Sequence, residues 1–295
     1  MNPGKLLCGI VALVALAVLP ACSAVDKVGK ADSLANAGIA FADAVPAFID
    51  ESFILAVTAD SLTLMQSRPD LSEDERSIGL QASDGALAAR LTILRDLKRH
   101  ALLLRSYFIA IKAITQSDAA SGITEQTKTI VARLGALSPT IGDASIGGVP
   151  ISDFIEPAVG IVVASYQNAV LRRELEERAD AVERELALQQ AALTAMRDQM
   201  IADKDLQVQI EERNPIFLTF VGNDPLPRNW SDQRVAAFKR TIGFESYDIA
   251  AKAAGDLRDS WIAFAEDRLD EGTLLLLIHD VEALVQLSEK IASAD

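Results

Sequence analysis

Two thiols and two imidazoles are the most reactive side chains in this 295-residue sequence. His100 and His279 are candidates for metal binding, which requires further ligands at fixed helical spacing. A di-iron carboxylate bundle places a glutamate three residues before such a histidine, but this chain has Leu97 and Leu276 at those positions. Neither histidine begins a His-Glu-x-x-His zinc motif. The sequence therefore lacks both kinds of metal site and predicts no metal ligands.

Other catalytic patterns are also missing from the sequence. The glycine-rich stretch 142–148 lacks the Lys-Ser/Thr pair of a phosphate-binding loop, and no Gly-x-Ser-x-Gly elbow is present. His279, Asp280 and Glu282 lie close together on the last expected helix, where a solvated polar edge is the favoured interpretation. We therefore expect no catalytic residues and no cofactor. An enzyme without a recognisable motif is the remote alternative.

The position of Cys22 indicates a different kind of chemistry. An apolar run begins at Leu6, is preceded by Lys5 and ends in Leu19-Pro20-Ala21, directly before the cysteine. A short basic start, an apolar core and small residues before a cleavage site are typical of an export signal. We therefore expect residues 1–21 to be a signal peptide. Cys8 lies inside that signal and would leave with it.

The stretch that ends at Cys22 resembles the lipobox of bacterial lipoproteins, in which the cysteine becomes the lipid-bearing first residue. The resemblance covers the first two dozen residues, and Pro20 stands where the motif more often has a small residue. It implies lipid attachment at Cys22 and an envelope location, and Ser23 favours the outer membrane, facing the periplasm. The open alternative is an ordinary cleaved secretory signal. With Cys22 lipidated, no disulfide or cysteine metal site is expected.

The charge balance excludes one class of partner. Removal of residues 1–21 would leave 27 basic and 42 acidic side chains, a net charge of −15, because the only charged side chain in that segment is Lys5. Nucleic acid is not an expected partner, since it requires clustered Lys and Arg. The acidic balance also argues against broad attraction of the whole protein to anionic lipid.

Apolar periodicity predicts an all-α fold, an elongated multi-helix bundle with long antiparallel helices over residues 31–295, preceded by a tether at 22–30. The first helix should span about 31–66, with a kink or split at Pro46. Ser72 and Glu75 form a capping-box pattern that should open a helix reaching about Thr115. A further helix should cover about 123–137.

Glycine and proline clusters at 138–150 and 214–230 predict breaks in the helical pattern and possible subdivisions of the bundle. Asp153 and Glu156 offer a capping pair, after which a single long helix is expected over 161–214, with an apolar seam that needs a partner helix in the same chain or another. Residues 216–221 should be a short extended piece or an exposed hydrophobic loop. Later helices should begin at Ser231, with a bend at Gly243, and span 272–292, with 274–278 deeply buried.

One surface feature is a candidate for interaction. A basic stripe, spaced at helical intervals, is formed by Arg95, Lys98, Arg105 and Lys112. The favoured interpretation is a solvated face or an internal partner for an acidic helix such as 174–185. The functional alternative is contact with lipid phosphates or an acidic protein.

The sequence as a whole favours a lipid-anchored binding or structural module that acts through its helix faces on a protein partner or a second copy. The rival is a membrane-active protein, because helical pore-forming toxins resemble this layout of long helices with a short apolar hairpin. The apolar segments 155–163 and 216–221 discriminate between them. We expect both to be buried core, and the rival requires them to be exposed.

Overall fold

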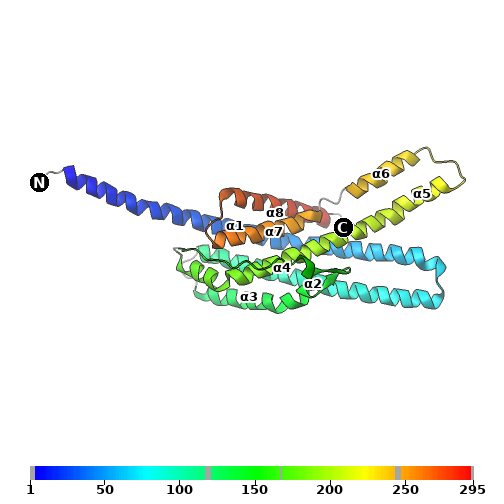
Figure 1. Ribbon diagram of the computed structural model, residues 1–295, viewed down its shortest axis with the longest axis horizontal. Helices are drawn as coiled ribbons and strands as arrows, with labels where there is room; N and C mark the ends of the chain where they lie inside the picture. The colour runs from blue at the N-terminus through cyan, green and yellow to red at the C-terminus, as the bar shows by residue number, and fades with distance from the viewer. Residues whose placement is uncertain (1–3, 117–120, 167, 243–246, 294–295) are drawn as a thin grey trace.

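The computed structural model describes residues 4–116, 121–166, 168–242 and 247–293, with side chains from residue 27 onward except at 121 and 240–242. Long helices lie side by side along one axis, so the molecule is elongated (Figure 1). The main helices are α1 (Gly4–Ser67), α2 (Glu73–Gln116), α3 (Ser121–Gly142), α4 (Ala169–Val208), α7 (Asp248–Ala265) and α8 (Glu271–Ala292). The expected all-α bundle of long helices is confirmed.

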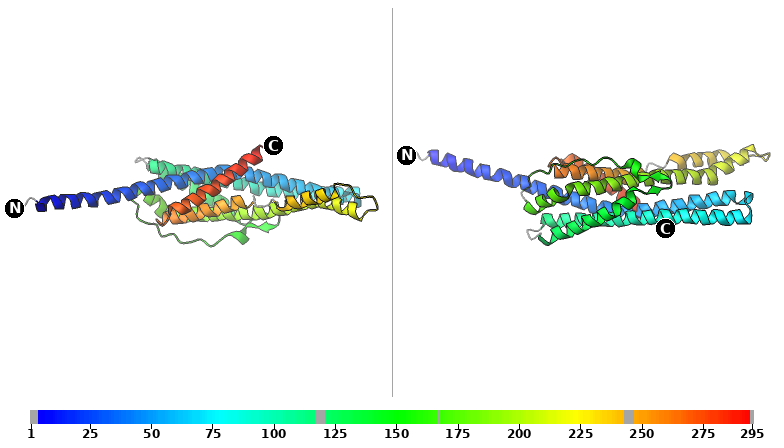
Figure 2. Two further views of the ribbon diagram at one scale, coloured as in Figure 1. Left: turned by 90° about the horizontal axis from the view of Figure 1, so that it is seen from above. Right: turned by 60° about the horizontal axis from the view of Figure 1, so that its bottom comes forward.

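Helix α1 is continuous over 64 residues, and its N-terminal part projects beyond the other helices (Figure 2). Residues 22–30, the expected tether, are therefore helical and continue α1. They contain one glycine and no proline, so they extend a helix that is already nucleated by its packed part. The packing begins close by. Lys27 Nζ lies 2.6 Å from Asp267 Oδ2, and Ala31 is fully buried.

The same helix passes through Pro46 without ending, so the expected split is also wrong. Buried neighbours such as Phe48 hold α1 in the core and offset the hydrogen bond that proline removes. A turn with a short 3₁₀ helix, η1 (Arg68–Asp70), leads to α2. The capping box there is confirmed. Ser72 N and Oγ donate to Glu75 Oε2 at 2.8 and 2.7 Å, and these bonds lower the pKa of Glu75.

Helix α4 lies in the core and is covered by α1, α3 and α7. Its predicted apolar seam is buried inside the chain: Leu171, Leu175, Val182, Leu186, Leu193, Met196 and Met200. Trp261 of α7 donates from Nε1 to the Ala179 carbonyl of α4 at 3.1 Å. Its ring centroid lies 6.1 Å from that of Phe108. Gly38 of α1 is so close to Phe108 that an added Cβ would lie 2.5 Å from the ring.

The region after α3 differs from the predicted break. Helix α3 continues through Pro139 to Gly142, and a two-stranded hairpin of β1 (Ser145–Ile146) and β2 (Val149–Pro150) follows. Gly147 and Gly148 form its turn with φ of 59° and 90°, a region that favours glycine. A 3₁₀ helix, η2 (Ile151–Phe154), ends the region.

Residues 155–166 then run extended along the bundle, and we call this segment the strap. The prediction that Asp153 and Glu156 cap a helix here, leading into one by 161, is wrong. Bonds to the bundle hold the strap extended instead, since Glu156 pairs with Arg258 and the Ala164 amide donates to the Ala265 carbonyl at 3.0 Å. Helix α4 begins only at Ala169, where the Asn168 side chain accepts two amide hydrogen bonds.

Beyond α4 the chain stays helical through a π-turn, η3 (Gln209–Arg213), into α5 (Asn214–Val221). The expected extended piece at 216–221 is therefore wrong, and so is the start of the break at 214. A loop at 222–229 connects α5 to α6 (Trp230–Ile242), while Gly243 lies outside the described residues.

Helix α8 confirms the predicted last helix, but not its burial. Leu274 and Leu277 are buried, whereas Leu275 and Leu276 are 66% and 63% exposed. At 3.6 residues per turn, a run of consecutive side chains points in all directions around a helix. Other helices cover only one side of α8, so only part of the apolar run is buried. Across the described residues, none of the helices combines the length and apolarity that a bilayer span requires.

Candidate functional site

The most unusual surface is the hairpin of α5 and α6, which lies at the end of the molecule opposite the N-terminus (Figure 1). Seven large apolar side chains of this hairpin are exposed, and we call the surface they form the apolar tip: Phe217, Leu218, Phe220, Val221, Leu226, Val235 and Phe238. The four on α5 are each between 56% and 65% exposed. Exposed apolar clusters of this kind mark interaction sites in soluble proteins.

Local contacts order the apolar tip. The rings of Phe220 and Trp230 stack with centroids 5.4 Å apart, and Trp230 Nε1 donates to the Ile216 carbonyl at 3.2 Å. The Arg234 guanidinium lies 5.0 Å from the Trp230 centroid. These contacts join α5 to α6. Phe217 lines a hollow of about 430 Å³ together with Arg213 and Arg234.

A second hollow lies between the apolar tip and the end of α1. It has a volume of about 530 Å³, and Met65 on one side faces Phe217 and Leu218 on the other. Met65 is itself 66% exposed. The α1–α2 turn and the α5–α6 hairpin form two neighbouring arms (Figures 1 and 2), and this apolar hollow lies between them.

The prediction that both apolar segments are buried core is therefore wrong. Residues 216–221 are mostly exposed on α5, and in the strap Ile155, Val159 and Val162 are exposed while Ile161 and Val163 are half-buried. The sequence did contain a signal for the apolar tip. Residues 213–240 carry five Lys or Arg against two Asp, a net charge of +3, in a chain whose net charge is −14.

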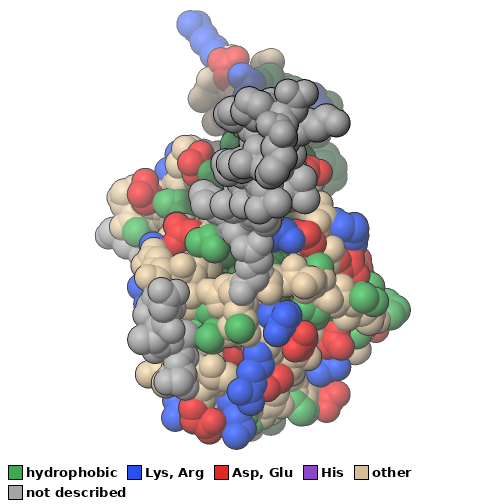
Figure 3. Space-filling model, turned by 90° about the vertical axis from the view of Figure 1, so that its left-hand side faces the viewer, with side chains coloured by type: hydrophobic (Ala, Val, Ile, Leu, Met, Phe, Trp, Pro, Cys, Tyr) green, Lys and Arg blue, Asp and Glu red, His purple; other side chains and the backbone are tan. Residues whose placement is uncertain are grey.

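The opposite end of the molecule has a different surface. Figure 3 views the end from which α1 projects, and there the described acidic and basic side chains are mixed, with hydrophobic side chains in small groups. The cluster of large exposed apolar side chains on α5 and α6 therefore lies at the other end of the molecule.

His100, one of the two histidines, is fully buried. Its Nδ1 lies 2.8 Å from Gln189 Oε1 and its Nε2 lies 3.0 Å from Glu185 Oε2. Ser138 Oγ donates to the same Glu185 oxygen at 2.5 Å. A nucleophilic triad needs the imidazole beside the hydroxyl, but here a carboxylate separates them. The cluster therefore satisfies buried polar groups and ties α2, α3 and α4 together.

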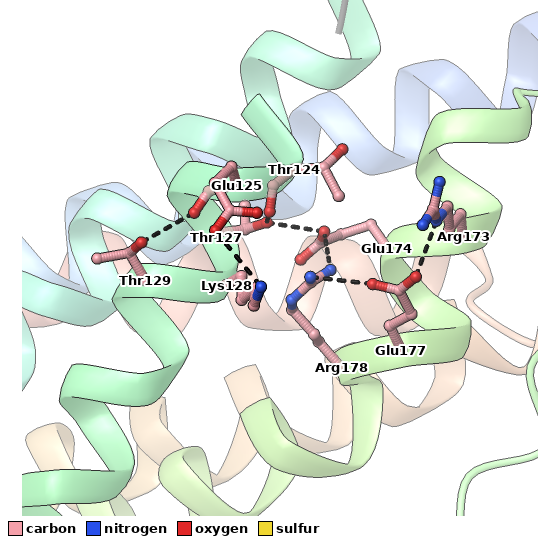
Figure 4. Close-up of polar contacts among 9 residues, drawn as sticks. All are labelled: Thr124, Glu125, Thr127, Lys128, Thr129, Arg173, Glu174, Glu177 and Arg178. Atoms are coloured by element: carbon pink, nitrogen blue, oxygen red, sulfur yellow. Dashed lines mark hydrogen bonds and ion pairs between the residues drawn. The ribbon is translucent and has the colours of Figure 1, made fainter. Parts of the chain in front are cut away.

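A second buried polar cluster joins α3 to α4 near the start of α4 (Figure 4). Glu174 Oε2 accepts hydrogen bonds from Thr127 at 2.8 Å and from Arg178 at 2.6 Å. Burial raises the pKa of the Glu174 carboxyl, and it raises the pKa of the neighbouring, fully buried Tyr107 well above its usual value. Both groups are fully buried between helices, so the role supported here is structural.

The predicted basic stripe pairs with helix α1. Lys98 Nζ lies 2.5 Å from Asp50 Oδ1 and Arg105 Nε lies 2.6 Å from Asp43 Oδ1. Further along, Lys112 donates to Asn36 Oδ1, and Arg95 is exposed. These contacts favour the structural interpretation, but the acidic partner is on α1 and not on the predicted segment 174–185.

The remaining candidates do not form a site among the described side chains. His279 is exposed on α8, and Asp280 beside it is paired with Lys252 of α7. Where side chains are described, no group of three His, Cys, Asp or Glu is arranged to hold a metal ion. Cys22 lies within helix α1, and its side chain is outside the described set. Comparison with protein-family models, curated proteins and solved structures gives no significant match for this chain.

Proposed function

We propose that this protein is a lipid-anchored binding module of the bacterial cell envelope, attached to the outer membrane through Cys22 and facing the periplasm. It acts by binding through exposed helix faces and not by catalysis. Helix α1 carries the bundle away from the lipid, and the far end of the bundle meets the partner. Because the α4 seam is buried inside the chain, we assign the binding face to its continuation, α5 with α6.

The observation that carries this proposal is the position of the apolar tip. Phe217, Leu218 and Phe220 are each more than half exposed, at the end of the molecule farthest from the N-terminus (Figure 1). Large apolar side chains that the chain itself leaves uncovered are stabilised when a partner removes them from water. A lipid at one end and an apolar surface at the other suit a protein that holds a partner at a distance from its membrane.

A membrane-active protein is the second candidate, and it is favoured by a specific observation. Both discriminating segments, 155–163 and 216–221, are largely exposed. Such a protein would release dye from liposomes, whereas a binding module would leave them intact.

An enzyme remains the remote alternative. Its best location is the hollow of about 610 Å³ between α3, α4 and the strap, which is lined by Ser138 and Glu185. No base other than this carboxylate contacts the Ser138 hydroxyl in the hydrogen bonds of the described residues.

The first experiment is the mass of the N-terminal peptide of the protein purified from a bacterial membrane. A peptide beginning at Cys22 with a diacylglyceryl-type increase in mass supports the anchor. An unmodified N-terminus refutes it, and Cys22→Ala provides the unlipidated control.

The second experiment tests the binding face in intact cells. A photo-crosslinking residue at position 218 should give a defined adduct, and the same residue at position 276 should not. Leu218 and Leu276 are a matched pair because they are 65% and 63% exposed on different helices. Equal crosslinking at both positions would contradict a binding role for the apolar tip.

A further inference from the structure

We propose that the apolar tip inserts into the surface of an anionic phospholipid bilayer, as a second membrane contact distinct from the N-terminal anchor. The inference deepens the proposed function by naming what the binding face recognises. The insertion itself depends only on α5 and α6, and the bridging of two membranes rests additionally on the lipid at Cys22.

The first argument is the shape of the apolar surface. Four apolar side chains of α5 spread around a large part of its circumference, and each is more than half exposed: Phe217, Leu218, Phe220 and Val221. A helix that is apolar on most sides is normally buried, yet here it stands at the end of a projecting hairpin (Figures 1 and 2). An apolar end with hollows in it fits a fluid medium that can fill them better than a rigid flat surface.

The second argument is length. Helix α5 has eight residues and is about 12 Å long at 1.5 Å per residue. A membrane span requires roughly 20 apolar residues, so α5 cannot cross a bilayer. Insertion to the depth of the headgroups and the first part of the acyl chains is the arrangement that its length allows.

The third argument is charge. Among the described side chains of the hairpin, the exposed cations are Arg228, Arg234 and Lys239, within a segment whose net charge is +3. Anionic headgroups attract Lys and Arg that lie close to the membrane surface. The −14 charge of the whole chain argues against general attraction of the protein to anionic lipid, so we assign the electrostatic contact to this positive segment. A second copy docked tip to tip would bring two positive segments together.

Trp230 adds an interfacial side chain to this surface. It is half-buried between Phe220 and Arg234, and tryptophan is enriched where apolar and polar phases meet. It is also a natural reporter, because the only other tryptophan, Trp261, is fully buried in the core.

Because the molecule is elongated, the apolar tip and the N-terminus would contact two different bilayers. The two ends of the elongated molecule face opposite directions (Figure 1). Helix α1 runs unbroken from Cys22 to Ser67, a separation of about 68 Å at 1.5 Å per residue. A protein anchored at one end therefore presents the apolar tip to a second surface at that distance.

The test uses full-length protein reconstituted through its own N-terminus into neutral phosphatidylcholine vesicles. Vesicles with phosphatidylglycerol and brominated acyl chains are then added, and capture by flotation is measured together with tryptophan quenching. We expect capture with quenching, weaker at high salt because exposed charges are screened. The variant F217S/L218S should capture about tenfold fewer vesicles or less, since it removes two inserted side chains.

The matched control is L275S/L276S on α8, which removes two leucines of similar exposure, 66% and 63%. It should capture anionic vesicles like the unchanged protein. Equal losses in both double variants would overturn the proposal, as would equal capture of added neutral vesicles. Capture without quenching would indicate contact by charge alone and would also overturn insertion.

Other occupants give different results. Clustering of the protein-bearing vesicles without any added anionic vesicles would identify a second copy at the apolar tip and overturn the proposal. Release of a dye trapped in the added vesicles would overturn shallow insertion in favour of permeabilisation. Quenching by anionic vesicles when the N-terminal peptide carries no lipid would support the insertion while refuting the anchor, so the two failures are distinguishable.

Discussion

Arg258 holds the strap to the core, and its removal should cost more stability than any surface change in this protein. Its guanidinium donates to Glu183 Oε1 from Nε at 2.9 Å and from Nη2 at 2.7 Å. Glu183 is fully buried and Arg258 is 3% exposed. A third contact reaches Glu156 of the strap, whose side chain is 62% exposed. One cation therefore pairs with a buried carboxylate through its Oε1 atom and fastens a surface segment.

The variant R258A leaves the Glu183 carboxylate buried without its cation. Breaking a buried pair on one side typically destabilises a protein by about 3–5 kcal/mol. The solvent-exposed contact to Glu156 adds at most about 1 kcal/mol, so E156Q should be nearly silent. Replacing both buried partners, as in E183L/R258M, removes the unpaired charge and should restore most of the loss.

Urea unfolding followed by circular dichroism measures these differences, because the unfolding midpoint shifts at constant m-value when only stability changes. Amide exchange of the strap provides a second measurement, since R258A should increase exchange at residues 155–166. An E183L/R258M protein as unstable as R258A would refute the reasoning, and so would an E156Q loss equal to that of R258A.

Two further predictions concern packing and pH. G38A should lower stability, because overpacking against Phe108 costs about 1–3 kcal/mol and exceeds the roughly 1 kcal/mol of helix propensity gained. Gly79 has open space around it, so G79A should raise the thermal midpoint of unfolding. A shift of the midpoint in the same direction for G38A and G79A would contradict this reasoning. Burial and a hydrogen bond with Asp280 raise the pKa of Asp256 to about 6. Folding then favours the protonated form of Asp256. As the pH rises from about 4 to about 6, the unchanged protein should therefore lose stability relative to D256N. A difference in the free energy of unfolding between the two proteins that stays constant over that range would refute this.

Local signals in the sequence were sufficient for most helices. The Ser72–Glu75 capping box and the apolar period of α2 depend on residues within a few positions of each other, and the structure confirms both. The strap was not predictable in this way. Its extended form depends on Arg258, which is 102 residues from Glu156, and periodicity does not report such distant pairs.

Burial was the less predictable property for a related reason. Periodicity identifies an apolar side chain but not whether another helix covers it. Leu276 on α8 and Leu218 on α5 have the same apolar character as the buried Leu277, and only the arrangement of the bundle separates them. The polar partners of His100 were likewise not predictable, because Glu185 and Gln189 come from another helix.

The helical form of residues 22–30 affects how widely an anchored molecule can explore its surroundings. A flexible nine-residue linker would have an end-to-end distance of about 16 Å in any direction, and the bundle on it would sweep out a hemisphere. A helix of the same length rises about 13 Å along one axis and passes directly into the packed part of α1 at Ala31. If Cys22 carries the lipid proposed above, residues 22–30 and the bundle would move as one body, so the far end of the bundle would stay at a fixed distance from the attachment point.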